Sequence, residues 1–280
     1  MKKWHLKFVL IVFFMCSSLF SQEKVVYKQI DSIALSMFIY SPENIDTSKK
    51  HPAIVFFFGG GWNEGSVKQF EPHAKYFAQR GLVCFLVDYR VKKKHQTTPF
   101  ESLKDAKSAI RFIRENAKNY HIDSEKIVAS GGSAGGQLAA ATALIDGYNE
   151  TSDNTFISCK PNALILFNPA IDNGPGGVGF DRVKDDYKNF SPIHNIKKRT
   201  PPTIIFLGTK DALIPVETVK KYQKLMNKAG SNCEVHLYEG KTHGFFNYNK
   251  FDNYKSTLLK ADAFLKSLGY LEEKPKIEVE

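Results

Sequence analysis

The chain has 280 residues, of which 42% are hydrophobic and 24% charged, and its formal net charge is +10 at pH 7. This length and balance fit one large domain with a well-buried core and exclude an intrinsically disordered chain. No nucleic-acid-binding motif accompanies the scattered lysines, so the sequence predicts no nucleic-acid partner despite the positive charge.

The first 21 residues have the layout of a secretory signal peptide. Residues 1–7 carry three lysines, residues 8–15 form an apolar run too short to span a bilayer, and small residues precede Gln22. We expect cleavage after Ser21, which predicts a secreted or periplasmic protein with no stable membrane insertion after cleavage. A lipoprotein anchored through Cys16 is the alternative, although bulky residues precede that cysteine.

Apolar strands alternate with helical patterns along the remaining chain. Strands are expected at 25–40 (a hairpin), 53–58, 82–87, 126–130, 163–167, 203–207 and 234–238, and helices at 68–79, 98–117, 136–143, 216–229 and 254–268. The alternation indicates an α/β fold of three layers, with a mostly parallel central sheet and helices on both faces.

The domain limits follow from the same pattern. Residues 22–271 form one predicted domain, and residues 272–280 form a charged tail. Within the domain, residues 173–199 are Gly-rich and irregular, and they could be a small lid or a loop at the mouth of a site.

The pattern G-x-S-x-G, at Gly131-Gly132-Ser133-Ala134-Gly135, falls between a predicted strand and a predicted helix. A strand-to-helix turn this tight forces Ser133 into a strained backbone conformation and presents its hydroxyl above the sheet. Glycines are needed there because side chains would clash with the strand and the helix. We therefore predict Ser133 as a catalytic nucleophile, with a Gly/Ser loop as the plain alternative.

A serine hydroxyl needs a base to accept its proton and an acid to orient that base. Asp211 follows the strand at 203–207, and His243 follows the last predicted strand, so both belong to the strand edge that ends in Ser133. Asp172 follows another strand and is the rival acid. His194 and His236 are weaker candidates for the base, because one lies in the irregular segment and the other inside a strand.

Acyl transfer also needs N–H groups for the developing oxyanion. The N–H of Ala134, directly after the nucleophile, is one expected donor. The glycines at 59–61 end an early strand, where the backbone can approach a substrate with no side chain in the way. A flexible turn is the alternative for these glycines.

The cysteines and lysine clusters carry little predicted chemistry. Cys84 lies in an apolar run as a core thiol, Cys159 and Cys233 could pair, and neither C-x-x-C nor H-E-x-x-H occurs, so we expect no metal and no cofactor. The basic clusters at 92–94 and 197–199 fall in predicted loops. Solvated loops are the expected role, and attraction to an acidic polymer is the alternative.

Four segments together carry a family resemblance: Phe58-Gly59-Gly60-Gly61-Trp62, residues 131–136, Gly208-Thr209-Lys210-Asp211 and His243-Gly244-Phe245. They resemble the α/β-hydrolase superfamily, and more narrowly its esterase/lipase branch with an H-G-G-G oxyanion motif. Phe58 stands where that motif has His. The resemblance implies Ser133, Asp211 and His243 as the catalytic triad, and the N–H groups of Gly60, Gly61 and Ala134 as the oxyanion hole.

The same motifs, with Ser191-Pro192-Ile193-His194, are similar to secreted bacterial acetyl and feruloyl esterases that act on polysaccharides. The resemblance implies a serine esterase acting on a small-molecule or polysaccharide ester through an acyl-enzyme. Two alternatives stay open: a serine exopeptidase of the same fold, and a binding protein that has lost the chemistry.

Overall fold

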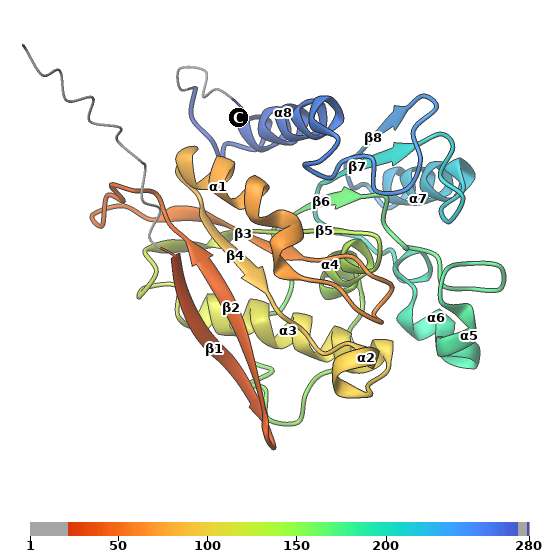
Figure 1. The fold of residues 1–280 in the computed structure, drawn as a ribbon, viewed down its shortest axis with the longest axis horizontal. Helices are drawn as coiled ribbons and strands as arrows, with labels where there is room; N and C mark the ends of the chain where they lie inside the picture. The colour runs from red at the N-terminus through yellow and green to blue at the C-terminus, as the bar shows by residue number, and fades with distance from the viewer. Residues whose placement is uncertain (1–21, 274–278, 280) are drawn as a thin grey trace, which may run out of the picture.

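The central element of the computed structural model, which describes residues 22–273 and 279, is one eight-stranded sheet (Figure 1). Its spatial order is β1-β2-β4-β3-β5-β6-β7-β8, antiparallel up to β4 and parallel from β4 to β8. The strands are β1 (Gln22–Ile30), β2 (Ile33–Tyr40), β3 (His51–Phe57), β4 (Val83–Val87), β5 (Ile122–Gly132), β6 (Ala163–Phe167), β7 (Thr203–Gly208) and β8 (Cys233–Tyr238).

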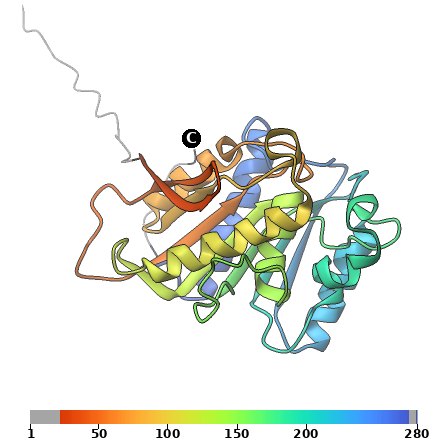
Figure 2. The ribbon, with the colours of Figure 1, turned by 90° about the horizontal axis from the view of Figure 1, so that it is seen from below.

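Helices cover both faces of this sheet (Figures 1 and 2). One face packs against α1 (Glu71–Gln79) and α8 (Phe251–Ser267), and the other against α3 (Pro99–Glu115), α4 (Ala134–Leu144) and α7 (Val216–Lys228). Short helices lie at α2 (Lys92–His95), α5 (Phe180–Val183) and α6 (Tyr187–Phe190). The three-layer α/β architecture that the sequence predicts is thereby confirmed.

Strand β3 shows why the sequences of the central strands are unbroken apolar runs. Val55 and Phe57 point into the core under α3 and α4, whereas Ile54 and Phe56 point into the core under α1 and α8. Both faces of the strand are buried, so hydrophobic side chains occupy every position rather than every second one.

Helix α3 begins as the sequence predicts. The Thr98 hydroxyl accepts the N–H of Phe100 at 3.3 Å, and the Glu101 carboxylate accepts the N–H of Thr98 at 2.9 Å. The reciprocal pair satisfies N–H groups that the first helical turn leaves without partners.

Two local expectations differ from the structure. The predicted helix at 68–79 is a 3-10 turn (η1, Val67–Phe70) followed by α1, because the Ser66 hydroxyl caps the earlier turn by accepting the N–H of Lys68. Lysines 92–94, expected in a loop, lie in the single turn of α2.

The irregular segment 173–199 folds into α5, α6 and two 3-10 turns. It packs against Trp62: a Cβ on Gly179 would lie 2.8 Å from the indole, and the Phe190 ring meets that indole edge-on at 6.1 Å. The segment is therefore held against the loop that follows β3.

The expectations about the leader, membrane insertion and the cysteines have different outcomes. The predicted signal peptide and Cys16 lie outside the described residues. Within residues 22–273, no helix combines the length and apolar character needed to cross a bilayer. Cys84 and Cys233 are buried, Cys159 is half-buried, and all three thiols are free rather than paired.

Four charged side chains form a buried network between β1 and α3. Asp105, with no exposed side-chain surface, accepts hydrogen bonds at 2.8 Å from both Lys28 and Arg90. Glu150 lies 3.0 Å from each of the same two cations. Two cations face two anions, so no charge in the network is left without a partner, which is the condition for tolerating buried ions.

His73 is buried in a different way. Its ring lies on α1 among aromatic side chains, edge-on to Phe167 and Tyr254, and neither ring nitrogen has a hydrogen-bond partner among the described residues. Burial lowers the pKa of His73 to about 3. The imidazole therefore stays neutral in the folded protein at any pH near neutrality.

Replacing His73 with Phe should make the folded protein less sensitive to acid. Between pH 6.5 and about 3 the unfolded chain binds a proton at His73 that the folded protein does not, so the free energy of unfolding falls as the pH falls, by about 1.4 kcal/mol per pH unit at most. Urea unfolding at pH 7 and pH 5 should show a smaller loss for His73→Phe than for the wild type. An equal loss in both proteins would contradict the assignment.

Candidate active site

Ser133 occupies the single residue between the end of β5 and the start of α4. Its backbone angles, φ 53° and ψ −117°, lie in a region that L-residues rarely adopt. Its N–H donates to the Phe167 carbonyl at 2.9 Å, and its carbonyl accepts the N–H of Ala170 at 3.1 Å. The segment after β6 thus holds Ser133 in the strained conformation that the sequence pattern predicts.

The glycines around Ser133 are required by close backbone approach. A Cβ on Gly131 would lie 2.3 Å from the Gly135 carbonyl oxygen, and a Cβ on Gly135 would lie 2.0 Å from the Phe57 carbonyl oxygen. A side chain at Gly131 would push β5 away from α4, and one at Gly135 would push α4 away from the end of β3, so the turn cannot form without these glycines.

Asp211 and His243 meet at the same edge of the sheet. Asp211 follows β7, His243 follows β8, and Asp211 Oδ2 lies 2.7 Å from His243 Nδ1. The other carboxylate oxygen accepts the N–H groups of Leu213 at 2.9 Å and Ile214 at 3.0 Å. The carboxylate is thus fixed by donors on both oxygens and can orient the imidazole.

Opposing effects set the ionisation of Asp211. Burial raises its pKa, but the hydrogen bonds from His243 and from the N–H groups of Ile214 and Leu213 outweigh burial, and the pKa lies below its usual value. The group is therefore a carboxylate at neutral pH, as an orienting acid must be.

The rival residues lie elsewhere. Asp172 Oδ1 accepts the N–H of Gly174 at 3.0 Å and so closes a turn. His194 packs edge-on against Tyr187, with ring centroids 5.3 Å apart, and His236 lies on β8 with Nε2 3.6 Å from Glu234. Among the described residues, none of the three forms a hydrogen bond or ion pair with His243.

The loop after β3 brings free N–H groups to Ser133. A Cβ on Gly59 would lie 3.4 Å from Ser133 Cβ, and Gly60 has φ 130°, which only glycine adopts readily. The N–H groups of Gly60 and Gly61 donate to no side chain or carbonyl within residues 22–273. The N–H of Ala134 begins α4 and has no partner within the helix.

Phe58 takes the place of the expected His by packing rather than by hydrogen bonding. Its ring stacks on Tyr89 with centroids 4.1 Å apart, and the Tyr89 hydroxyl donates to the Phe58 carbonyl at 2.6 Å. Both rings are buried. The stack fixes the start of the loop that carries Gly60 and Gly61.

Asn168 is a residue of the site that the sequence did not point to. It follows β6, is buried, and has φ 34°. Its Oδ1 accepts the N–H of Gly244 at 3.0 Å, and its Nδ2 lies 3.3 Å from His243 Nε2. Since a backbone N–H can only donate, it fixes the amide orientation, and Nδ2 must donate to Nε2. His243 therefore carries its proton on Nδ1, toward Asp211.

A second amide pair links the loop after β3 that carries residues 59–61, called the oxyanion loop below, to the loop that carries His243 and Gly244. The N–H of Gly59 donates to Gln69 Oε1 at 2.7 Å, Gln69 Nε2 donates to Asn247 Oδ1 at 2.9 Å, and Asn247 Nδ2 donates to the Gly244 carbonyl at 3.0 Å. We call the side chains of Gln69, Asn247 and Asn168 the amide chain. Every amide in it has its orientation set by a neighbouring backbone group.

One sequence signal could have found part of the amide chain. Asn168 is a polar residue at the carboxyl end of a buried parallel strand, the edge where such sheets build their sites. Gln69 and Asn247 carry no such signal, because they lie 178 positions apart and meet only through the fold.

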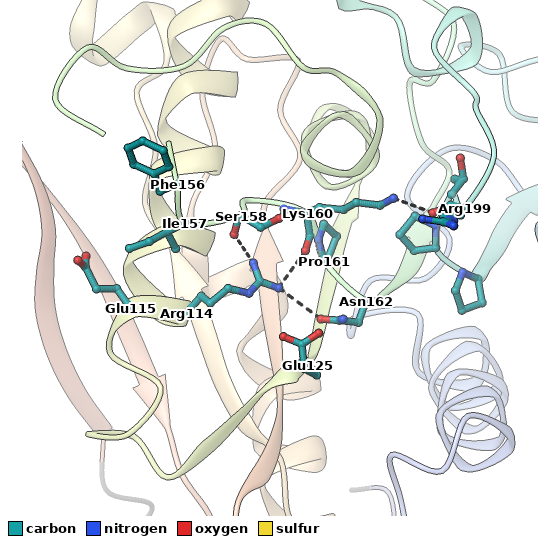
Figure 3. A pocket seen from close by; sticks show the side chains of 13 residues that line it. Arg114, Glu115, Glu125, Phe156, Ile157, Ser158, Lys160, Pro161, Asn162 and Arg199 are labelled. Atoms are coloured by element: carbon teal, nitrogen blue, oxygen red, sulfur yellow. Dashed lines mark hydrogen bonds between the residues drawn. The ribbon is translucent and has the colours of Figure 1, made fainter. Parts of the chain in front are cut away.

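The site lies away from a pocket of about 690 Å³ near the amino ends of β6 and β7 (Figure 3). There Arg114 donates to the carbonyls of Ser158 and Lys160 and to the Asn162 side chain, and Lys160 donates to the Arg199 carbonyl. These cations are committed to protein groups. Among the described residues, no cluster of three or more His, Cys, Asp or Glu could hold a metal ion.

The arrangement supplies the parts for attack on a carbonyl carbon. It contains a hydroxyl on a strained turn, an imidazole whose Nε2 is free of a proton, a buried carboxylate behind that imidazole, and N–H groups beside the hydroxyl. Ser133 and His243 are both hydrogen-bonded to the carboxyl end of β6 and the residues that follow it, the first through Phe167 and Ala170 and the second through Asn168.

Comparison with protein families gives two matches. Residues 37–173 match the family model described as BD-FAE, and residues 165–273 match the Dienelactone hydrolase family. The chain is 27% identical over 252 residues to an acetylxylan esterase from Xylanibacter ruminicola (83% of this chain, 48% of that protein). It is 28% identical over 222 residues to esterase LipC from Mycobacterium tuberculosis (71% and 54%). The chain thus spans about half the length of these two relatives.

Solved structures of one esterase match over almost its whole length. The apo form of Thermogutta terrifontis esterase 2 superposes with a TM-score of 0.87 at 43% identity, covering 90% of this chain and 97% of that one. The same esterase phosphoramylated by tabun matches with a TM-score of 0.87 at 44% identity, again covering 90% and 97% of the two chains.

The proton on His243 should be observable directly. We expect ¹⁵N NMR of the imidazole at pH 8 to show a protonated Nδ1 and a bare Nε2. In Asn168→Asp a carboxylate, which can only accept, would face Nε2, so the Nε2 signal should move from that of a bare nitrogen toward that of a protonated one.

Asn189→Asp on α6, which is exposed and outside the site, is the matched control and should leave the imidazole signals in place. A wild-type spectrum with the proton on Nε2 would contradict the orientation assigned to Asn168.

Proposed function

The chain belongs to the esterase/lipase branch of the α/β-hydrolase superfamily, and we propose that it hydrolyses carboxylic esters through an acyl-enzyme formed on Ser133. The contact between Asp211 and His243, at the strand edge where the strained Ser133 turn also lies, carries the proposal. The esterases among its relatives support the same reaction class.

In the first step the Ser133 hydroxyl oxygen attacks the ester carbonyl carbon, and His243 Nε2 accepts the hydroxyl proton. The negative charge that develops on the carbonyl oxygen is stabilised by the N–H groups of Gly60, Gly61 and Ala134. Asp211 stabilises the imidazolium without taking its proton. His243 then gives the proton to the leaving alcohol as the carbon–oxygen bond breaks.

In the second step water replaces the alcohol. His243 takes a proton from the water, whose oxygen attacks the acyl carbon, and the same N–H groups hold the oxyanion again. The proton returns to Ser133 as the acid leaves. Asn168 must release Nε2 when the Ser133 hydroxyl donates to it, so the contact at 3.3 Å describes the resting site.

We propose acetyl or feruloyl esters on polysaccharides or small alcohols as the substrates, for a secreted or periplasmic enzyme. The acetylxylan esterase among its relatives supports this choice, as does the signal-peptide layout of residues 1–21. Hydrolysis rates on acetylated xylan, methyl ferulate and 4-nitrophenyl esters of different acyl lengths would rank the acyl groups. Faster turnover of aminoacyl-nitroanilides would favour an exopeptidase instead.

Replacing Ser133 with Ala should lower kcat/KM on 4-nitrophenyl acetate by about 10³-fold or more, because the attacking oxygen is lost while the fold keeps its contacts. The wild type should also be labelled at Ser133 by a fluorophosphonate, as expected of a relative of an esterase phosphorylated by paraoxon. Wild-type activity in Ser133→Ala would overturn the proposal, and an unlabelled, inactive wild type would favour a binding protein.

Asp211→Asn and Asp172→Asn separate the two candidate acids. Asn at 211 keeps the shape but removes the charge that stabilises the imidazolium, so kcat should fall by about 10³-fold or more. Asp172→Asn alters only a turn and should change kcat by less than about threefold. A larger loss for Asp172→Asn, measured on the same ester, would reverse the assignment.

A further inference from the structure

A second pocket, of about 430 Å³, lies beside the oxyanion loop, with Asn63 from the end of that loop in its wall. Three of its lining side chains are cations, Lys92, Lys93 and Arg182, and none is acidic. The remaining lining residues are polar apart from Pro99. The pocket therefore concentrates positive charge with no acidic side chain in its wall.

Backbone hydrogen bonds attach this pocket to the oxyanion loop. The N–H of Lys92 donates to the Trp62 carbonyl at 3.0 Å, and the N–H of Lys93 donates to the Asn63 carbonyl at 2.9 Å. A Cβ on Gly61 would lie 3.7 Å from Arg182 Nη2. A group bound at Arg182 would therefore lie close to Gly61, one of the proposed oxyanion donors.

Arg182 differs from the buried arginines of the protein. Arg80, Arg90 and Arg111 each contact a carboxylate at 3.0 Å or less. Arg182 makes no ion pair with any residue in 22–273, and its guanidinium lies over the Trp62 ring, 5.1 Å from the centroid. Burial lowers the pKa of Arg182, although Asp181 acts in the opposite direction.

Of the other polar groups of the pocket, some already have a partner in the protein and some do not. Lys93 is already paired with Glu64 at 2.6 Å. Lys92 has no acidic partner in the described part of the chain, and the Thr97 hydroxyl is buried there without a hydrogen-bond partner. Two cations and one hydroxyl are thus available to a ligand. A guanidinium is a planar fork that matches the two oxygens of a carboxylate.

We propose that this pocket, through Arg182, binds a carboxylate that the ester substrate carries away from the bond that is cleaved. The inference rests on the proposed esterase function and narrows it to acidic esters. Lys92 adds a second positive charge, and the net positive charge that the chain keeps without the lysines of residues 1–21 would draw such a substrate toward the site.

The test compares acidic esters with neutral esters of the same shape. On the acyl side the pair is monomethyl glutarate and methyl pentanoate, and on the alcohol side it is 4-acetoxybenzoate and 4-acetoxybenzamide. The readout is the ratio of kcat/KM for the acidic ester to that for its neutral partner. The pair that responds to the variants identifies which part of the substrate carries the carboxylate.

In Arg182→Gln this ratio should fall by about tenfold or more for at least one pair, as expected when a charged hydrogen bond is lost. Lys92→Gln should lower the same ratio by a smaller factor, and Arg182→Lys should restore part of it. Lys94→Gln is the matched control: it removes a charge from the same short helix, but Lys94 pairs with Asp88 outside the pocket, so the ratio should stay within twofold.

Each outcome separates this inference from the proposed function. Hydrolysis with ratios that neither Arg182→Gln nor Lys92→Gln changes would overturn the carboxylate pocket and leave the esterase standing. A folded wild type that hydrolyses neither these four esters nor 4-nitrophenyl acetate would overturn the esterase. Binding of monomethyl glutarate, measured by titration, would then test the pocket. Binding by the wild type that is lost in Arg182→Gln would support the pocket, and no binding by the wild type would refute it.

Discussion

Hydrogen bonds from amide groups hold the candidate site in one arrangement. Gln69 and Asn247 connect the loop after β3 to the loop after β8, and Asn168 connects that second loop to the end of β6. Because backbone groups fix each amide orientation, the loops cannot shift independently without leaving a polar group unpaired. The positions of His243 and of the oxyanion loop therefore depend on each other.

The fold was predictable because its signals are local. The apolar runs from β3 to β7, the capping box at Thr98 and the glycines around Ser133 each report the structure of their own few residues. The short helices α5 and α6 have no such pattern, because their place is set by packing against Trp62 and not by their own periodicity.

In the candidate site, too, residues with a local sequence signal were predictable and the others were not. Ser133, Asp211 and His243 follow predicted strands, so their common edge could be inferred from the order of elements along the chain. The side chains that orient them could not, because Gln69 meets Asn247 across most of the chain. The cationic pocket beside the oxyanion loop likewise joins Lys92 to Arg182, which are separate in sequence. Contacts of this kind exist only after folding.

The stacked pair of Phe58 and Tyr89 has one more consequence. A histidine in the place of Phe58 would gain or lose a proton at a pH near neutrality, and its support of the loop would change with that proton. The stacking of two aromatic rings does not depend on pH in this way. The Tyr89 hydroxyl keeps its proton because burial raises its pKa well above the usual value. The glycine turn should thus keep its shape from mildly acidic to alkaline surroundings.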